Sequence, residues 1–397
     1  MSLVEHAIWW HVYPLGATGA PIRGVPDAAH RLSRLEGWLD YAVELGCSGL
    51  LLGPVFRSTS HGYDTLDHFA IDPRLGTEED FDHLVAAARG RGVAILLDGV
   101  FNHVGAQHPM VSDPGSPIRR VDGRPVGWES HDDLVLLDHA DPRTADLVVE
   151  CMLHWLRRGI AGWRLDVAYA VPSWFWRKVT ERVRGEFPEV VFVGEVIHGD
   201  YARIADEGGL DSVTAYELWK ATWSSIAERN FWELAWALER HDHFSEGHVL
   251  QTFVGNHDVA RIASQVGDAG SVLALAVLMT TPGMPSIYYG DEQAFRGEKG
   301  SREWADDPLR PELPSTPGEL ASDGWWLYRV HQDLIGIRRR HPWLTRGRVR
   351  VVAKDLAYIT YETSGDGHTM RVELALEPAP SVRISVDGSD VYGWGLT

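Results

Sequence analysis

The sequence predicts an α/β fold in which eight parallel strands, each followed by a helix, close into a (β/α)8 TIM barrel. Short apolar runs recur along the chain, and stretches with apolar residues three and four positions apart separate them. Polar residues follow directly after several of these runs, where the carboxyl ends of barrel strands would meet. A short inserted subdomain after the third strand and a small C-terminal antiparallel β domain complete the predicted architecture.

The strands and helices are predicted from apolar runs and apolar spacing. We predict the eight barrel strands, in chain order, at Ile8–Tyr13, Gly49–Leu52, Ala94–Asp98, Gly162–Asp166, Val191–Glu195, Ser212–Ala215, Val249–Phe253 and Ser286–Tyr289. The intervening segments are typical of amphipathic helices closed by a glycine, as in "RLSRLEGWLDYAVELG", "TEEDFDHLVAAARGRG" and "DPRTADLVVECMLHWLRRG".

Two segments depart from this alternation and define the predicted domains. Residues 103–141 are rich in Gly, Pro and Asp, show little periodicity and are too long for an ordinary connection. Beyond "IRRRHPW" the pattern changes to strict alternation, as in "SVRISVD", which is typical of antiparallel strands. The sequence therefore predicts a barrel over 1–102 and 142–343, an inserted subdomain B over 103–141 and a C-terminal β domain over 344–397.

The composition limits the classes of molecule that the protein is expected to bind. The 56 acidic and 37 basic residues give a formal net charge of -19, which opposes binding to nucleic acid and to anionic membranes. The two cysteines, Cys47 and Cys151, lie in no metal or redox motif, so we expect buried thiols. Neither a leader peptide nor a run of membrane-spanning length is recognisable. We expect a cytoplasmic protein, although an exported form trimmed before Met1 would look similar.

Residues with acid, base and hydrogen-bonding side chains gather at the predicted carboxyl ends of the strands. They are Tyr63 in "HGYDTLD", Asp98, Asn102 and His103 in "DGVFNH", Arg164 and Asp166 in "GWRLDVA", Glu195 in "VGEVI", Trp219 in "AYELWK", and His257 and Asp258 in "FVGNHD". Because barrel enzymes keep their active sites at this rim, we expect these side chains to share one cleft.

Arg164 and Asp166 are two residues apart in a predicted strand, so their side chains share a face. Three carboxylates (Asp166, Glu195 and Asp258) brought to one rim would repel each other in a low-dielectric cleft. We expect Arg164 to hold Asp166 ionised, while crowding and burial raise the pKa of Glu195. That division would leave a nucleophile beside a proton donor, as in glycosidases that retain the anomeric configuration.

The four segments "DGVFNH", "GWRLDVA", "VGEVI" and "FVGNHD", in this order, resemble the conserved regions of the alpha-amylase family, glycoside hydrolase family 13. "SHGYDTLDHFAIDPRLGT" and "GMPSIYYGDE" extend the resemblance over the whole barrel. It implies that Asp166 is the nucleophile, Glu195 the acid/base, and Asp258 the residue that grips hydroxyls of the distorted sugar. No cofactor is implied.

The resemblance also assigns four residues to the substrate or to the nucleophile, and two further substrate-site candidates, Asp98 and Trp219, come from their positions alone. Arg164 is assigned to the nucleophile, His103 and His257 to hydroxyls of the same sugar, and Tyr63 to a stacking platform beneath it. Taken alone, Asp98 is better interpreted as a structural anchor for the loop and for Arg164. Trp219 is kept as a candidate platform because it lies at the rim.

The sequence departs from the family pattern at two places. Many members bind calcium through the asparagine of the first region and an aspartate in an "LPDLN"-like stretch, but here "LVLLDHADP" places Leu136 at that aspartate. Leucine has no oxygen ligand for a hard cation, so no metal is expected there although Asn102 is present. After the nucleophile, "GWRLDVA" is similar to the cyclomaltodextrinase and neopullulanase branch, and Tyr169 and Ala170 replace the lysine and histidine of many endo-amylases.

Three functions remain open from the sequence. The leading hypothesis is a hydrolase of α-glucosidic bonds in maltooligosaccharides or related α-glucans. A transglycosylase or isomerase acting on trehalose or sucrose would use the same glycosyl-enzyme and another acceptor. A catalytically inactive binding or scaffold member would be expected to lack Asp166, Glu195 or Asp258, and all three are present. The oligomeric state is not predicted.

Overall fold

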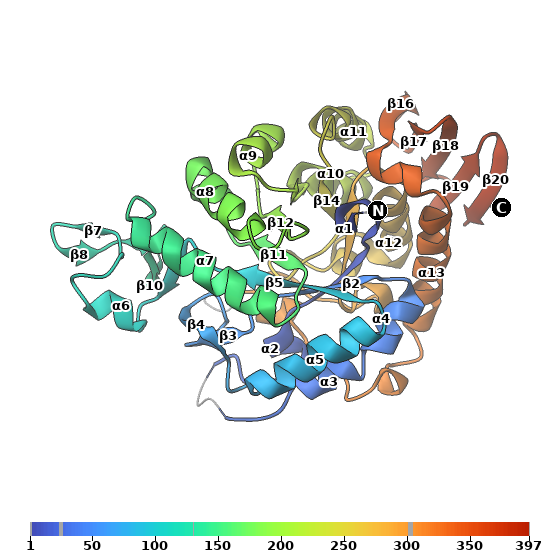
Figure 1. Cartoon of the computed structure of the whole chain (residues 1–397). Helices are drawn as coiled ribbons and strands as arrows, with labels where there is room; N and C mark the ends of the chain where they lie inside the picture. The colour runs from blue at the N-terminus through green and yellow to red at the C-terminus, as the bar shows by residue number, and fades with distance from the viewer. Residues whose placement is uncertain (1, 24–26, 130, 301–304, 397) are drawn as a thin grey trace.

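The computed structural model describes residues 2–23, 27–129, 131–300 and 305–396, and at its centre lies a sheet of eight parallel strands surrounded by helices (Figure 1). Each predicted barrel strand is present. The strands are β1 (Trp9–Val12), β2 (Gly49–Leu52), β5 (Ala94–Gly99), β11 (Gly162–Leu165), β12 (Val191–Gly194), β13 (Ser212–Val213), β14 (Gln251–Phe253) and β15 (Met284–Tyr288). They are ordered β13-β12-β11-β5-β2-β1-β15-β14.

The barrel closes between its two terminal strands, β13 and β14, through a short contact. Thr214 and Gln251 form an isolated parallel bridge, and the Ala215 N–H donates to the Gln251 carbonyl over 2.9 Å. Every other neighbouring pair of strands is joined by a ladder of two or more residue pairs, for example four between β11 and β12. The predicted (β/α)8 fold is confirmed, with one weak seam.

Helices surround the sheet, and local signals in the sequence set their ends. The α-helices are α1 (Leu3–His6), α2 (Pro14–Ala17), α3 (Leu32–Glu36), α4 (Leu39–Leu45), α5 (Glu78–Gly90), α6 (Pro109–Ser112), α7 (Pro142–Arg157), α8 (Ser173–Arg184), α9 (Tyr201–Gly208), α10 (Tyr216–Ala227), α11 (Trp232–Phe244), α12 (Ile262–Thr280) and α13 (Trp325–Arg340). Thr77 and Asp80 form a capping box that starts α5, while Asp141 caps α7 ahead of a proline. Gly46 ends α4 in the left-handed conformation.

Among the residues that the structure describes, five short 3-10 helices complete the helical segments. They are η1 (Ala168–Ala170), η2 (Asp291–Gln293), η3 (Asp307–Leu309), η4 (Pro317–Glu319) and η5 (Pro342–Arg346). The first two follow directly after barrel strands β11 and β15, so they belong to the rim at which the predicted site residues gather.

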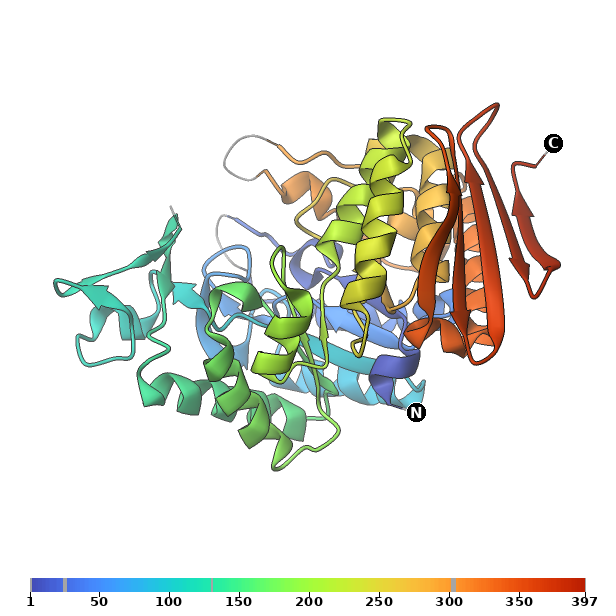
Figure 2. The ribbon, with the colours of Figure 1, turned by 90° about the horizontal axis from the view of Figure 1, so that it is seen from above.

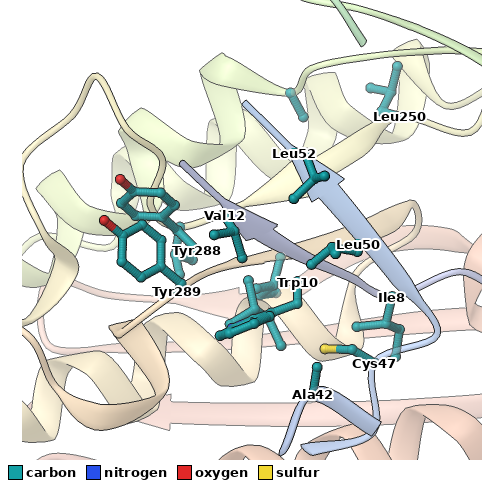
Figure 3. Packing of buried hydrophobic residues seen from close by; sticks show 14 of the residues in the cluster. Ile8, Trp10, Val12, Ala42, Cys47, Leu50, Leu52, Leu250, Tyr288 and Tyr289 are labelled. Carbon is teal, nitrogen blue, oxygen red and sulfur yellow. The ribbon is translucent and has the colours of Figure 1, made fainter. Parts of the chain in front are cut away.

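Aromatic and aliphatic side chains fill the layer between the sheet and its helices. Figure 3 shows Trp10 of β1 pointing from the sheet towards Ala42 and Cys47, beside Ile8 and Leu50. Trp10 also lies 6.0 Å from Trp38, ring centroid to ring centroid, in a stacked arrangement. Both predicted buried thiols, Cys47 and Cys151, are buried and unpaired.

The expectation that no run reaches membrane-spanning length was wrong, because one helix in the described ranges, α12, has the length and apolar composition of such a span. Its residues from Gly270 to Thr280 are buried within the protein, against α10, α13 and the C-terminal sheet. The apolar character of α12 is therefore explained by its place in the core.

The insertion after β5 and the C-terminal sheet lie on opposite sides of the barrel (Figures 1 and 2). In the insertion, β6 (His103–Gly105), β10 (His131–Leu136) and β9 (Gly127–Trp128) form one sheet, and β7 (Arg120–Val121) pairs with β8 (Arg124–Pro125). A further pair, β3 (Phe56–Ser58) and β4 (Thr65–Ile71), follows β2.

The C-terminal strands form an antiparallel sheet in chain order, as the alternating pattern predicts. They are β16 (Arg348–Lys354), β17 (Tyr358–Gly365), β18 (His368–Ala375), β19 (Ser381–Val386) and β20 (Ser389–Trp394). Apolar residues on one face, such as Val372 and Ile384, are buried, and β18 and β19 contact α12.

Candidate active site

The rim of the barrel contains a cleft of about 440 Å³ that gathers most of the predicted site residues. Six of the nine line it: Tyr63, His103, Asp166, Glu195, Trp219 and Asp258. The insertion adds Trp128 and Leu134 to its wall, so the cleft lies between the barrel and the inserted segment. The remaining three, Asp98, Arg164 and His257, are buried beside these residues and do not line the cleft.

Strand register explains why Arg164 lies among several carboxylates. β11 lies between β5 and β12, and Arg164 pairs directly with Asp98 across the sheet. Its guanidinium Nη1 donates to both Asp98 oxygens, over 2.7 and 2.6 Å, and Nη2 lies 2.6 Å from Glu195. The contact between Arg164 and Asp166 is longer, at 3.2 Å. One buried cation therefore serves three carboxylates.

This sharing corrects the expected division of charge, in which Arg164 holds Asp166 ionised. Desolvation by burial raises the pKa of the Asp166 carboxyl well above its usual range, and Arg164 only partly opposes this effect. The nearby carboxylates of Glu195, Asp98 and Asp258 raise it further. Arg164 contacts Asp98 and Glu195 more closely than Asp166, so its charge offsets the burial of Asp166 only in part.

A strained residue follows Asp166 and shapes the next contact. Val167 has φ +40°, a left-handed conformation that is rare for a β-branched residue. In this conformation its N–H donates to Glu195 Oε2 over 3.0 Å. Strain of this kind costs on the order of 1–3 kcal/mol and is typical of functional sites. A strained turn directly after Asp166 therefore links this part of the chain to Glu195.

The other carboxylate oxygen of Glu195, Oε1, lies at one end of a relay of hydrogen bonds that leads to Asp258. The Tyr216 hydroxyl donates to Glu195 Oε1 over 3.1 Å, and the Asn256 amide donates to that hydroxyl over 2.9 Å. The side-chain oxygen Oδ1 of Asn256 in turn accepts a hydrogen bond from the backbone N–H of Asp258 over 2.9 Å. Tyr216 and Asn256 thus connect the two sides of the site.

Asp258 is fixed by two basic groups, and its side chain is 34% exposed in the cleft. Arg310 Nη2 donates to Oδ1 over 2.9 Å, and His257 Nε2 lies 3.0 Å from Oδ2. Desolvation raises the pKa of Asp258, but His257 and Arg310 outweigh it and hold the pKa well below the usual range. Asp258 is therefore the carboxylate that stays ionised most readily.

The predicted platform Tyr63 is half-buried, and its hydroxyl is held by polar neighbours. Its hydroxyl donates to Asp98 Oδ2 over 3.0 Å and also contacts His257 Nε2. Its ring stacks on that of His257, with centroids 5.3 Å apart. Tyr63 thus connects two groups of residues: the Arg164 cluster, formed by Arg164 with Asp98, Asp166 and Glu195, and the Asp258 cluster, formed by Asp258 with His257 and Arg310.

His103 lies on the insertion side of the cleft, in β6. Its ring stacks on Trp128, and burial lowers its pKa to about 4. The imidazole is therefore neutral near pH 7 and can both donate and accept a hydrogen bond.

Trp219 lines the opposite side of the cleft, half-buried on α10. Its ring stacks on Phe253, with centroids 6.1 Å apart, and meets the Tyr216 ring edge to face. These contacts fix the indole at the rim, as a platform requires.

The residues at the family's calcium position do not fit that ion. Leu136 pairs with His103 between β10 and β6, and the Asn102 amide contacts His103 Nδ1 over 3.2 Å. Within the described ranges there is also no group of three or more His, Cys, Asp or Glu residues placed to hold a metal. Independence from calcium remains a prediction.

Sequence reasoning missed Tyr216, Asn256 and Arg310. Asn256 stands inside "FVGNHD", so its position beside His257 was a usable signal. Tyr216 and Arg310 carry no comparable signal, because each acquires its role from strands and loops that are distant in the sequence.

Comparison with known proteins identifies the relatives of this chain. Residues 32–118 and 129–323 match the profile of the family described as alpha amylase, catalytic domain. The chain is 33% identical over 362 residues to neopullulanase 2 of Thermoactinomyces vulgaris, covering 84% of this chain and 58% of the relative. It is 32% identical over 283 residues to an intracellular maltogenic amylase of Bacillus subtilis, covering 66% of this chain and 48% of the relative.

A solved structure has the same architecture over almost its full length. The cyclic α-maltosyl-(1→6)-maltose hydrolase of Arthrobacter globiformis superposes with a TM-score of 0.81 at 25% identity, covering 94% of this chain and 92% of that one. The chain thus spans about half to three fifths of the two curated relatives, but nearly all of this shorter enzyme.

Proposed function

Since the chain belongs to the alpha-amylase family, we propose that it is a retaining glycoside hydrolase that cleaves α-glucosidic bonds in maltooligosaccharides or related α-glucans. The observation that carries this proposal is the convergence of Asp166, Glu195 and Asp258 on one cleft, each held by a different set of donors.

In the proposed reaction, the Asp166 carboxylate attacks the anomeric carbon while Glu195 gives its proton to the departing glycosidic oxygen. The bond to the leaving sugar breaks and a glycosyl ester on Asp166 forms. Glu195, now a carboxylate, then takes a proton from water, whose oxygen displaces Asp166. Two inversions at the anomeric carbon return it to its original configuration.

The surrounding residues bind the sugar or position the acids. Asp258, His257 and His103 are proposed to accept and donate hydrogen bonds to sugar hydroxyls, with Tyr63 beneath the ring. Asp98 and Arg164 are positioning residues, because both are buried: Asp98 holds Arg164, and Arg164 contacts Asp166 and Glu195. Trp219 is the proposed platform for the part of the substrate beyond the cleavage point.

We further propose a cytoplasmic location, supported by the intracellular maltogenic amylase among the relatives. An uncharged glucan suits a chain of net charge -19, which disfavours nucleic acid and anionic membranes as partners.

The test uses the Asp166→Asn and Glu195→Gln variants on maltotriose, cyclodextrin and pullulan. Each should reduce turnover by roughly three orders of magnitude or more, because each removes a covalent or proton-transfer step, while the melting temperature shows that the fold is kept. An aryl glycoside with a good leaving group should partly rescue the first step in Glu195→Gln, but not in Asp166→Asn.

The stereochemistry of the first product provides an independent test. Proton NMR at early times should show the α-anomer before mutarotation; an initial β-anomer would refute retention. Added glucose as a competing acceptor distinguishes transfer from hydrolysis, because transfer would form new oligosaccharides. Near-normal turnover by Asp166→Asn would refute the assigned nucleophile.

A further inference from the structure

A second groove, of about 330 Å³, opens beside the catalytic cleft between α10 and α11. Three residues (Ile197, Tyr216 and Trp219) line both, so the two hollows share a wall. Ile197 follows Glu195 by two residues, and Tyr216 donates to Glu195. The groove therefore continues the cleft on the side of the residue that would protonate the leaving sugar.

The far wall of the groove carries an exposed indole whose position is fixed. Trp236 of α11 lines the groove and is 56% exposed, which is unusual for so large an apolar residue. The Arg240 guanidinium lies over this ring, 4.8 Å from its centroid, and is itself held by two hydrogen bonds to Glu217. Arg240 thus braces the indole and leaves much of the ring open.

Polar groups border the same groove in fixed positions. Lys220 Nζ lies 2.6 Å from Glu233 Oε1, while the Ser224 hydroxyl donates to Oε2 over 2.7 Å. Each carboxylate oxygen has room for more than one donor. Glu217 and Glu233 can therefore accept hydrogen bonds from hydroxyl groups of a ligand without losing their present partners.

We propose that this α10–α11 groove is a second carbohydrate-binding site, which takes the leaving-group portion of an α-glucan longer than the catalytic cleft can hold. A flat indole suits the apolar face of a glucose ring, and fixed carboxylates with a cation suit its hydroxyls. An α-glucan is uncharged, so the acidic chain does not repel it. The inference rests on the proposed function, which places the leaving sugar beside Glu195.

The test compares Trp236→Ala with Trp174→Ala on substrates of different length. Trp174 of α8 is a matched control, because it is also 56% exposed and lines neither hollow. Loss of a stacking contact on the order of 1.5 kcal/mol should lower kcat/KM for maltoheptaose about tenfold in Trp236→Ala. The decrease for maltotriose should be less than threefold, and Trp236→Phe should restore most of the loss.

Binding supplies a readout that does not depend on turnover. In the Asp166→Asn background, Trp236→Ala should weaken maltoheptaose affinity about tenfold by calorimetry, while Trp174→Ala should leave it unchanged. An equal effect of Trp236→Ala on both substrate lengths, or unaltered maltoheptaose affinity, would overturn the inference.

The two proposals fail in different ways. If the wild-type protein cleaves no α-glucan, the proposed function fails, and calorimetry on the wild-type protein and Trp236→Ala still decides the second site. If cleavage occurs without a length-dependent role of Trp236, only the second site fails. Equal melting temperatures exclude loss of folding as the cause.

Discussion

Tyr216 lies between two parts of the site that are far apart in the sequence. Its hydroxyl donates to Glu195 and accepts from Asn256, which in turn holds the backbone of Asp258. Burial raises the pKa of Tyr216 well above its usual range, so the hydroxyl keeps its proton at all working pH values. It is a permanent donor to the carboxylate form of Glu195.

Tyr216→Phe removes this donor and leaves the ring in place. A hydrogen bond to a charged group contributes about 1.5–3 kcal/mol, so kcat should fall by roughly tenfold to a hundredfold. A kcat equal to that of the wild-type protein would show that the relay does not act on Glu195.

At this scale the sequence predicts residues that lie within motifs and misses those defined by tertiary contacts. Asp166, Glu195 and Asp258 were found because each follows an apolar strand, and all three line one cleft. The shared position of Arg164 could not be found, because it depends on the pairing of β11 with both β5 and β12. The sequence indicated Asp166, two residues away, and Asp98 as an anchor for Arg164, but it did not indicate the contact with Glu195.

Close approach of neighbouring strands sets the position of β11. A Cβ atom on Gly162 would lie 2.0 Å from the Val191 carbonyl oxygen of β12, and backbone atoms cannot move aside cheaply. The glycine at the start of β11 therefore allows the close pairing with β12, the strand that leads to Glu195, and so helps to place Arg164 beside that carboxylate.

Gly162→Ala should lower the free energy of unfolding by about 1–3 kcal/mol, and more if the strands separate. Activity should fall with it, because the Arg164 cluster shifts. Gly90→Ala is the control: no atom lies within 4 Å of its added Cβ, and it should leave stability unchanged or slightly increased. Urea unfolding measures both, and equal effects of the two substitutions would contradict this account of β11.

Another element-scale prediction concerns Glu292, fully buried in η2 after β15. Its Oε1 accepts from the Tyr41 hydroxyl over 2.9 Å, and Oε2 accepts from the Gly290 N–H over 3.0 Å. Burial raises its pKa from 4.5 to about 7. The folded protein thus keeps a proton that the unfolded chain releases, so stability from this group is complete below pH 4.5 and lost as pH rises through 7.

Glu292→Gln should remove this pH dependence. Between pH 5 and pH 8 the wild-type protein should lose about 2–3 kcal/mol of unfolding free energy more than the variant does. Urea titrations at the two pH values measure the difference. Glu150→Gln, at an exposed position on α7, should show the wild-type pH dependence; an identical result for Glu292→Gln would contradict a raised pKa.

The barrel elements were more predictable than the insertion. Each barrel strand is a buried apolar run, and burial on both faces gives the same signal wherever the strand pairs. The insertion builds its sheet from short strands such as β9 and β6, whose two and three residues are too few to show alternation. Length, rather than composition, limited the prediction there.

At the scale of the whole molecule, the insertion and barrel are joined by side chains. His103 Nε2 contacts the Tyr63 carbonyl over 3.1 Å, and His139 Nε2 contacts the Phe101 carbonyl over 3.0 Å. Leu136, at the family's calcium position, pairs with His103 in the ladder between β10 and β6. Hydrogen bonds and packing thus link the parts around the cleft.

We expect activity and melting temperature to be independent of calcium, because Leu136 offers no ligand oxygen. Prolonged dialysis against a chelator, followed by calorimetry and an assay on maltotriose, should give the values of the untreated protein. A large loss restored specifically by calcium would reveal a site that Leu136 does not predict. A Leu136→Asp variant, tested in parallel, asks whether a carboxylate is enough to create one.

The short seam between β13 and β14 has a kinetic consequence. Because a single bridge at Thr214 and Gln251 closes the barrel there, opening this edge breaks fewer hydrogen bonds than parting any ladder of the sheet. Amide deuterium exchange should therefore be faster at Ala215, whose N–H donates across this seam, than at the central strand residues Trp163 and Arg164. Helix α10 begins at Tyr216, directly after the seam. Each opening of the seam would therefore loosen the wall that the cleft shares with the α10–α11 groove. This opening would occur at the wall of the groove that is proposed to hold the leaving-group portion of a long α-glucan.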